Sequence, residues 1–400
     1  MNKKLFETLH LRGFLSFGPE SQPVGLTGLN VLIGPNGVGK SNFVEAIELL
    51  HAAPKDFSAA IRIGGLPSNW IWHGRDGAAS ARLEARLGAV DNTPELRYGI
   101  EFMQNADRLE ITDEILEDAD KIEPHVKDVR FYYRLRRGRP VISVRQRSAD
   151  SAAGAYTPRD LPQLPLHLSA LSQIKDPASF PEFSAVAERF NNIQIFREWG
   201  FGRSSALRVP QPANLPTDVL LPQLVNLGLV LNELEQGHTW VRFNELMHGF
   251  LPRFTRLTTK VSGGSVQIFL HEDGLGVPVP ATRLSDGTLR FLALLAILLN
   301  AESSPLICIE EPELGLHPDA MSILAELLVE ASEKTQIIVT THSDALVSAF
   351  TQRTDSVLVC DYLENGTELR RLDAEKLAHW LKDYRLGDLW RTGKLGGNLW

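Results

Sequence analysis

The stretch that decides the fold reads Gly34-Pro35-Asn36-Gly37-Val38-Gly39-Lys40-Ser41. An apolar run, Leu29 to Ile33, leads into it, and the residues from Asn42 to Leu50 repeat their apolar positions with helical spacing. A glycine-rich turn between a strand and a helix is the setting in which this pattern forms a phosphate-binding loop. We therefore predict that residues 34–42 hold the phosphates of ATP. The alternative is a glycine-rich turn that happens to precede a helix.

Each residue type in this turn suits phosphate chemistry. The three glycines let backbone N–H groups point inward at phosphate oxygens, with the positive end of the following helix behind them. Lys40 supplies a point charge for the β- and γ-phosphates, and the hydroxyl of Ser41 can take one position around Mg²⁺. ATP and Mg²⁺ are thus the predicted ligands.

A second stretch places two carboxylates at the end of an apolar run, in the sequence LICIEEP from Leu306 to Pro312. A parallel strand buried on both faces reads as such a run, and its carboxyl end is where α/β sheets bind ligands. Glu310 is then placed to hold Mg²⁺, and Glu311 to orient or deprotonate the attacking water. The alternative is a buried strand that ends at a solvated acidic turn.

Two further turns carry groups that can contact a phosphate. Ser285, Asp286 and Gly287 open a long apolar helix, where a helix cap can also grip a phosphate. His342 follows the strand predicted at Gln336–Val339, from which its ring can reach a γ-phosphate or the attacking water. Taken alone, the first is an ordinary helix cap and the second a polar turn residue.

Bulk composition favours a globular protein of the cytoplasm. The 400 residues are 43% hydrophobic and 22% charged, with a formal net charge of -8. That balance disfavours a protein built to coat nucleic acid. The two cysteines lie in apolar runs and suggest a reduced compartment. We find no signal peptide and no apolar run long enough to span a membrane, so we expect no membrane partner.

The pattern along the chain predicts an α/β nucleotide-binding domain cut in two, with a mixed or parallel sheet and flanking helices. The expected division is a first lobe at 1–150, a mainly helical insert at 151–254 and a second lobe at 255–400. Short strands at 81–87, 96–102, 129–135 and 141–147 suggest an antiparallel β lobe. An acidic helix is expected near Thr112–Glu123, and an exposed loop at 148–165.

Four motifs together resemble those of ABC-type ATPases, in the same order. GPNGVGKSN, LSDGTLR, ICIEEPELGLHP and THS would be the Walker A, signature, Walker B with D-loop, and switch-histidine motifs. Roughly 240 residues separate Ser41 from Ser285, far more than in a transporter domain. The chain therefore resembles the RecF/SMC-like branch. More narrowly, it resembles the compact AAA-type predicted ATPases related to the OLD family, which carry Glu-Glu in Walker B, an LSDGT signature and a Leu-Gly-x-Leu-Trp tail like that at 386–390.

This resemblance implies more than the residues alone. In such proteins Ser285 and Gly287 would touch nucleotide held by the P-loop of the opposite subunit, which implies an ATP-bound homodimer with two shared sites. Relatives often work beside a separately encoded nuclease or toxin in bacterial defence against phage. The chain departs from the pattern in having Glu310 where Asp is usual. A Q-loop glutamine is also unassigned, with Gln104 and Gln146 as candidates.

One dense basic run, Lys127–Arg147, could bind DNA. On an extended strand Arg130, Arg134 and Arg136 would share one face, with Arg137 next to them. The alternative is a solvated sheet face balanced by the acidic residues at 113–123. Three functions stay open from sequence: an ATPase switch for a partner effector, a DNA-clamping repair or maintenance ATPase, and an ATP binder without turnover.

Overall fold

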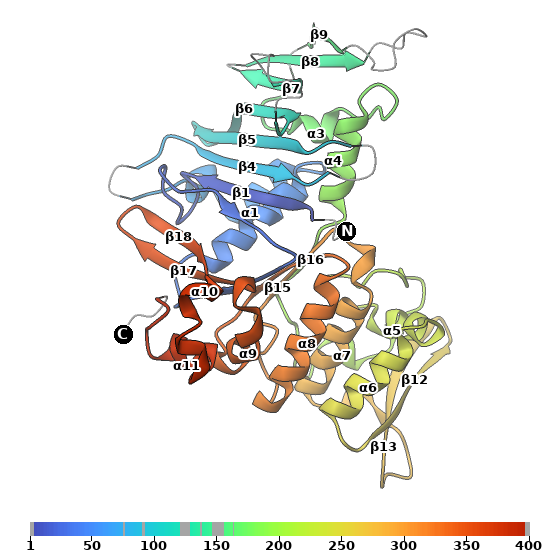
Figure 1. Ribbon diagram of the computed structural model, residues 1–400. Helices are drawn as coiled ribbons and strands as arrows, with labels where there is room; N and C mark the ends of the chain where they lie inside the picture. Colours follow the sequence, from blue (N-terminus) through green and yellow to red (C-terminus); the bar gives the residue numbers. More distant parts are fainter. Residues whose placement is uncertain are drawn as a thin grey trace.

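The computed structural model describes residues 4–74, 77–89, 93–120, 129–136, 138–145, 156–162 and 164–396. A six-stranded sheet lies at its centre (Figure 1). Its strands, in spatial order, are β10 (Gln194–Phe196), β15 (Leu306–Glu310), β16 (Gln336–Thr340), β3 (Leu29–Ile33), β17 (Val357–Leu363) and β18 (Gly366–Arg371). The first five run parallel and β18 is antiparallel. All residues of β3 and β16 are buried, as the continuous apolar runs predicted.

The two faces of this sheet belong to two different apolar clusters. On one face Val31, Ile337 and their neighbours pack with helices of the second half of the chain. These helices are α7 (Asp286–Leu299), α8 (Met321–Ser332), α9 (Asp344–Ala349) and α11 (Leu386–Arg391). On the other face Leu32, Cys308 and Ile338 pack with α1 (Lys40–Ala52). The sheet is therefore covered on both sides.

An antiparallel sheet of eight strands lies beyond α1 (Figure 1). Its strands, in spatial order, are β2 (Val24–Gly25), β1 (Phe6–Arg12), β4 (Ala81–Leu87), β5 (Leu96–Asn105), β6 (Arg108–Asp118), β7 (Phe131–Arg136), β8 (Arg139–Arg145) and β9 (Tyr156–Asp160). Its buried residues share one cluster with those of α1, α2 (Phe57–Ile63) and α4 (Pro181–Asn191). This sheet is the predicted antiparallel β lobe, and the fold class is the predicted mixed α/β head.

The acidic helix predicted near Thr112–Glu123 is wrong, because residues 108–118 form β6. Ile111 and Ile115 have helical spacing, but pairing with β5 on one side and β7 on the other outweighs that local pattern. The buried carboxylate of Glu114 fixes the strand, since it accepts hydrogen bonds from Tyr98, Ser169 and the backbone N–H of Ala170. The loop expected at 148–165 also contains a strand, β9.

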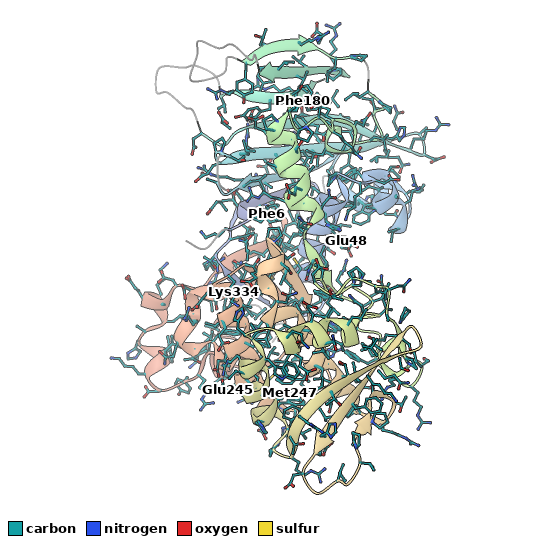
Figure 2. The ribbon with its side chains drawn as sticks, turned by 90° about the vertical axis from the view of Figure 1, so that its right-hand side faces the viewer. Phe6, Glu48, Phe180, Glu245, Met247 and Lys334 are labelled. Atoms are coloured by element: carbon teal, nitrogen blue, oxygen red, sulfur yellow. The ribbon has the colours of Figure 1, made fainter. Side chains whose placement is uncertain are left out.

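The middle of the chain contributes to several layers. Helices α3 (Ala170–Gln173) and α4 pack with the eight-stranded sheet, while α5 (Leu227–Gln236) and α6 (Trp240–Phe250) pack with α7. Figure 2 shows Phe180, at the start of α4, on the side of the eight-stranded sheet, and Met247 of α6 in the lower half of the view. A third sheet contains β11 (Gln211–Pro212), β12 (Phe254–Ser262), β13 (Ser265–Glu272) and β14 (Val279–Pro280).

The remaining regular elements are short. They are α10 (Ala374–Leu377) and 3-10 turns at Pro67–Trp70, Ala206–Arg208, Ala281–Arg283, Ala301–Ser303, Pro318–Ala320, Thr351–Ser356 and Trp380–Lys382. Within the part of the chain that the structure describes, no helix is both long and apolar enough to cross a membrane.

Candidate nucleotide-binding site

The predicted phosphate-binding loop joins the central strand β3 to α1, which begins at Lys40. Two of its glycines are required by their surroundings. Gly34 has a φ of 150°, and a Cβ there would lie 2.5 Å from the carbonyl oxygen of Cys360. Gly39 has a φ of 103°, and a Cβ there would collide with the hydroxyls of Thr367 and Ser16. These tight contacts fix the loop against β17 and β18.

Side chains next to the loop hold its shape. Thr367 donates a hydrogen bond to the carbonyl oxygen of Val38 at 2.6 Å, and Asn42 donates to Ser16 at 2.8 Å. Pro35 is half-buried, whereas the residues at the tip, Asn36 and Gly37, are exposed, as is Ser41. The loop is thus braced from behind and open at its tip.

Lys40 lies within this loop with its ammonium group buried. Its Nζ donates to the carbonyl oxygens of Gly34 and Pro35, both at 2.7 Å. Burial lowers the pKa of Lys40, against the opposing effect of Cys360 and of the nearby carboxylates of Glu311 and Glu310. A buried ammonium held only by carbonyl oxygens can turn toward a phosphate without breaking an ion pair.

The ends of three adjacent parallel strands gather the other predicted residues at this loop. In the sheet register Glu310 lies beside Thr340, and Thr340 lies beside Leu32 of β3. The pairing continues one residue further, since the backbone N–H of Glu311 donates to Thr340 and that of Thr341 donates to Leu32. Lys40, Glu310, Glu311 and His342 are therefore brought to one edge of the sheet, the carboxyl edge where α/β sheets bind ligands.

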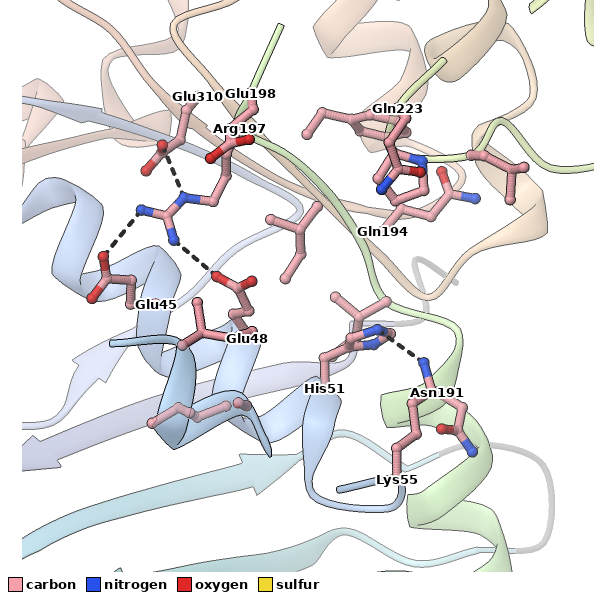
Figure 3. Close-up of a pocket in the computed structure, with 18 of the residues that line it drawn as sticks. Glu45, Glu48, His51, Lys55, Asn191, Gln194, Arg197, Glu198, Gln223 and Glu310 are labelled. Carbon is pink, nitrogen blue, oxygen red and sulfur yellow. Dashed lines mark hydrogen bonds and ion pairs between the residues drawn. The ribbon is translucent and has the colours of Figure 1, made fainter. Parts of the chain in front are cut away.

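Glu310 offers an oxygen suited to a metal ion. Its Oε2 accepts a hydrogen bond from Nε of Arg197 at 3.1 Å (Figure 3). Its Oε1 is buried and has no hydrogen-bond partner among the described residues. A buried carboxylate oxygen left in this way fits a hard cation or one of its water ligands, and the exposed hydroxyl of Ser41 is a second ligand of the same kind. The residues present thus fit Mg²⁺.

Glu311 has a strained backbone that aims its side chain. Its φ is 46°, in the left-handed region, which costs a residue other than glycine about 1–3 kcal/mol. Two hydrogen bonds hold it there: its N–H donates to Thr340 at 3.0 Å, and its carbonyl accepts from Nη1 of Arg290 at 3.0 Å. Strain of this kind persists where the surroundings over-determine it, and it concentrates at functional sites.

His342 faces Glu311 across the end of the sheet. Its Nε2 lies 3.6 Å from Oε1 of Glu311. Burial lowers the pKa of His342, and the charge of Lys40 lowers it further, while Glu311 acts in the opposite direction. The imidazole is therefore mainly neutral at pH 7, so one of its nitrogens can accept a hydrogen bond.

The sequence reasoning missed three residues that shape this edge. Oε1 of Glu313 accepts hydrogen bonds from the Thr341 hydroxyl at 2.6 Å and from the backbone N–H of His342 at 2.9 Å. Burial raises the pKa of Glu313. Arg290 lies against the rings of Trp199 and Phe201, and Arg197 pairs with Glu310. The only sequence signal for any of the three was that Glu313 is a third acid after Glu310 and Glu311. From that run we predicted roles only for Glu310 and Glu311.

The predicted signature turn lies elsewhere on the surface. Ser285 caps α7 by accepting a hydrogen bond from the backbone N–H of Thr288 at 3.0 Å. Asp286 pairs with Arg208, and a Cβ on Gly287 would lie 2.6 Å from the carbonyl oxygen of Gly315. Ser285 and Asp286 are exposed. No hydrogen bond or ion pair of the described residues joins this turn to the phosphate-binding loop of the same chain.

The described part of the basic run lies around β7 and β8, away from the nucleotide edge, and two of its arginines are paired, whereas Arg139 is exposed. Arg130 lies 4.0 Å from Asp118, and Arg134 lies 3.1 Å from Glu117. Both acids belong to β6, the strand beside β7. The backbone of Arg136 ends β7, but its side chain and all of Arg137 lie outside the described residues.

Neither Q-loop candidate can be placed at the nucleotide edge. Gln104 lies on β5 in the eight-stranded sheet, where its Oε1 accepts a hydrogen bond from the N–H of Ser68. Gln146 lies outside the described residues. At the nucleotide edge, the residue that follows β10, the strand next to β15, is Arg197 and not a glutamine.

Comparison with known proteins agrees with this arrangement. The model of a family described as "AAA domain, putative AbiEii toxin, Type IV TA system" matches residues 29–348. The Old nuclease of Escherichia phage P2 is 33% identical over 130 residues, which is 30% of this chain and 22% of that protein. The chain thus spans about a fifth of the length of this relative.

Two solved structures share the fold. An SmcHead bound to the C-winged helix domain of ScpA has a TM-score of 0.57 at 15% identity, covering 93% of this chain and 99% of that one. An Smc head domain with an extended coiled coil, bound to the C-terminal domain of ScpA derived from Pyrococcus furiosus, has a TM-score of 0.54 at 14% identity. That match covers 95% of this chain and 99% of the other.

The family match spans most of the chain, and the likeness to the Smc heads covers 93% of it. The protein therefore belongs to this AAA-domain family, is similar over part of its length to the Old nuclease, and has the fold of the Smc head domains.

Proposed function

We propose that this chain is a Mg²⁺-dependent ATP hydrolase that works as an ATP-bound homodimer. The observation that carries the proposal is the placement of Lys40, Glu310, Glu311 and His342 at the ends of three adjacent parallel strands. Backbone strain at Glu311 supports a functional role for this residue, because such strain concentrates at active sites, ligand clamps and switch regions. A carboxylate held 3.6 Å from a histidine at this edge favours turnover over the non-hydrolysing alternative.

The proposed roles follow from the environment of each group. The backbone N–H groups of residues 34–42 and the ammonium of Lys40 would hold the phosphates. Glu310 and Ser41 would hold Mg²⁺, which when bound neutralises charge on the phosphates. Glu311 would orient and deprotonate the attacking water, with neutral His342 accepting or donating a hydrogen bond beside it. This chemistry would need no rearrangement of the core, because α1 and Lys40 already lie at the loop.

The homodimer is proposed because three of the predicted nucleotide contacts, Ser285, Asp286 and Gly287, lie apart from the loop. Ser285 and Asp286 are exposed at the N-terminus of α7, a position that favours an anion. Gly287 packs so closely on Gly315 that no side chain fits there, so the turn is bare at this position. A second copy related by two-fold symmetry would place this turn over the opposite loop and create two identical sites.

We further propose that the dimer is a nucleotide-controlled switch for a separately encoded, nuclease-like effector in the bacterial cytoplasm, in defence against phage. Support comes from the partial likeness to the Old nuclease of a phage, of which this chain matches about a fifth. Because the likeness covers only about a fifth of that protein, we propose that the nuclease activity in its name comes from a second polypeptide here. The family description, which names a toxin, points the same way.

Direct clamping of DNA is the second candidate, and the basic run is its only basis. Arg130 and Arg134 already face the carboxylates of Asp118 and Glu117, so they have little charge left for phosphates. Replacing Arg134, Arg136 and Arg137 by Glu tests this candidate. DNA binding that is salt-dependent in the wild type and lost in the variant would favour the clamp over the effector switch.

The proposal is tested by trapping the dimer. Glu311→Gln should hydrolyse ATP at least about 100-fold more slowly while it still binds nucleotide, because only the base is removed. With Mg²⁺ and ATP it should therefore accumulate as a species of twice the single-chain mass in light scattering. The exposed Glu364→Gln, on the turn between β17 and β18, is the matched control and should behave as wild type. Wild-type turnover by Glu311→Gln, or a monomer under all conditions, would contradict the proposal.

A further inference from the structure

Arg197 connects the strand that carries Glu310 to the helix that carries the phosphate-binding loop. It follows β10, the strand at the edge of the central sheet. Its guanidinium contacts three carboxylates at once (Figure 3). Nε lies 3.1 Å from Glu310, Nη1 lies 2.8 Å from Glu48, and Nη2 lies 3.2 Å from Glu45. Glu45 and Glu48 are both on α1, which begins at Lys40.

This contact places a permanent positive charge beside Glu310, the carboxylate that we propose as a ligand of Mg²⁺. A guanidinium is charged at every working pH, and its planar fork suits carboxylates. The Glu310 side chain is only 15% exposed, so water screens the contact weakly. A cation that approaches Glu310 must therefore overcome the field of Arg197 or take its place.

The guanidinium has both a second set of partners and room to move. Its Glu48 partner is 46% exposed and lies toward solvent. Arg197, Glu45, Glu48 and Glu310 all line one cleft of about 1000 Å³, shown in Figure 3. The backbone on either side is held, because Phe196 pairs with Ile309 and Trp199 donates to the carbonyl of Glu310 at 2.9 Å. Withdrawal from Glu310 onto Glu45 and Glu48 thus needs only a side-chain movement.

We propose that Arg197 is a positioning residue that acts as an internal counter-cation of Glu310 and raises the Mg²⁺ concentration at which the site fills. Glu310 then accepts Mg²⁺ when nucleotide phosphates add their own charge, and Arg197 turns to Glu45 and Glu48. The inference rests on the proposed ATP site and adds a control on its metal. It also accounts for the longer Glu310 in place of Asp, since the extra methylene lets one carboxylate reach the guanidinium with Oε2 and leave Oε1 for a metal.

The test measures nucleotide binding rather than turnover. A fluorescent ATP analogue is bound to the full chain at fixed concentration while free Mg²⁺ is raised from zero. Arg197→Gln should lower the Mg²⁺ concentration for half-saturation by about tenfold, because a full charge next to Glu310 is removed. Arg197→Lys keeps the charge and should stay within about twofold of wild type.

A matched control separates this effect from loss of an ion-pair cluster. Arg242 also contacts three carboxylates, Glu245, Glu326 and Glu330, but it joins α6 to α8. Arg242→Gln should leave the Mg²⁺ requirement unchanged even if both variants lower the unfolding temperature. Circular dichroism establishes that each variant is folded.

A second variant probes the cluster from its exposed side. Glu48→Gln removes one of the partners that draw Arg197 away from Glu310, so it should raise the half-saturating Mg²⁺ concentration by about threefold. The same change in Glu245, the exposed partner of Arg242, is its control. This variant decides the matter if Arg197→Gln does not fold.

The outcomes are distinct. An Arg197→Gln requirement equal to or above that of wild type overturns this inference and leaves the proposed function standing, and so does an unchanged or lowered requirement in Glu48→Gln. A wild-type chain that binds no nucleotide at any Mg²⁺ concentration overturns both. Opposite shifts from Arg197→Gln and Glu48→Gln support it.

Discussion

Two regions of this molecule are rich in charge, and they treat it differently. In the eight-stranded sheet the arginines bridge carboxylates on neighbouring strands. Arg82 contacts Glu84, Glu101 and Asp113, and its side chain is only 13% exposed. Arg97 and Arg134 form similar pairs across β4, β5, β6 and β7. The charges of these three arginines are matched by carboxylates within the protein.

At the carboxyl edge of the central sheet Arg197 pairs with Glu310, but the charges of Lys40 and Glu311 are not matched in this way. Within the described residues, Lys40 forms no ion pair and donates only to backbone carbonyls. Glu311 has a largely neutral histidine as its partner, and Glu310 keeps one oxygen without a hydrogen bond. Matched charges hold a sheet together, whereas unmatched charges raise the energy of the folded chain until a ligand of opposite charge binds.

The largest effect is expected from removing Lys40, the cation at this edge that forms no ion pair among the described residues. Lys40→Ala should reduce ATP hydrolysis by at least about 100-fold, because no other described cation is positioned in the loop to meet the phosphates. The unfolding temperature should change little, since no ion pair is lost. Lys55→Ala, just beyond α1, is the control and should keep wild-type activity. Phosphate release by Lys40→Ala at the wild-type rate would mean that the site is assigned wrongly.

The matched region should give the reverse result. Arg82→Ala leaves three carboxylates close together and partly buried, so the free energy of unfolding in urea should fall by about 2 kcal/mol. ATP hydrolysis by the folded variant should be unchanged. The more exposed Arg86→Ala should lose less than about 1 kcal/mol. A large loss of turnover in folded Arg82→Ala would show that the two regions are not independent.

The smallest expected effect is on the ionisation of His342. Its pKa should lie below the usual 6.5 in an NMR titration, and it should rise in Lys40→Ala because a nearby positive charge is gone. Since the folded state holds this proton less tightly than the unfolded state, the contribution of His342 to stability is complete above pH 6.5. That contribution is lost as the pH falls through the lower, folded-state pKa. A His342 pKa above 6.5 would mean that the ring is exposed or paired differently.

The sequence could predict the parts of the site that local chemistry dictates. The strand at Leu29–Ile33 is confirmed to the residue and the one predicted at Gln336–Val339 to within one residue, because their runs are buried on both faces and end in marked turns. The position of Glu310 and His342 at one edge of the sheet follows from the rule that parallel strands end at one edge. Pattern and topology suffice for such features.

The missed features depend on partners far away in the chain. The segment at 108–118 has a helix-like pattern and is a strand only because β5 and β7 pair with it. The three residues of β10 are too short for a pattern, and Arg197 meets Glu310 across 113 positions of sequence. The left-handed backbone of Glu311 is likewise fixed by Thr340 and Arg290. None of these has a local signal.

The central claim, that one chain holds half of each ATP site, is tested most directly by mixing two inactive variants. Lys40→Ala lacks a working loop, and Ser285→Arg blocks the signature turn. A mixed dimer contains one site with neither defect, and half of randomly paired dimers are mixed, so an equal mixture should recover about a quarter of the wild-type ATPase rate. The account predicts this recovery from two subunits that are each inactive alone. A mixture that remains inactive while it still forms dimers would contradict it.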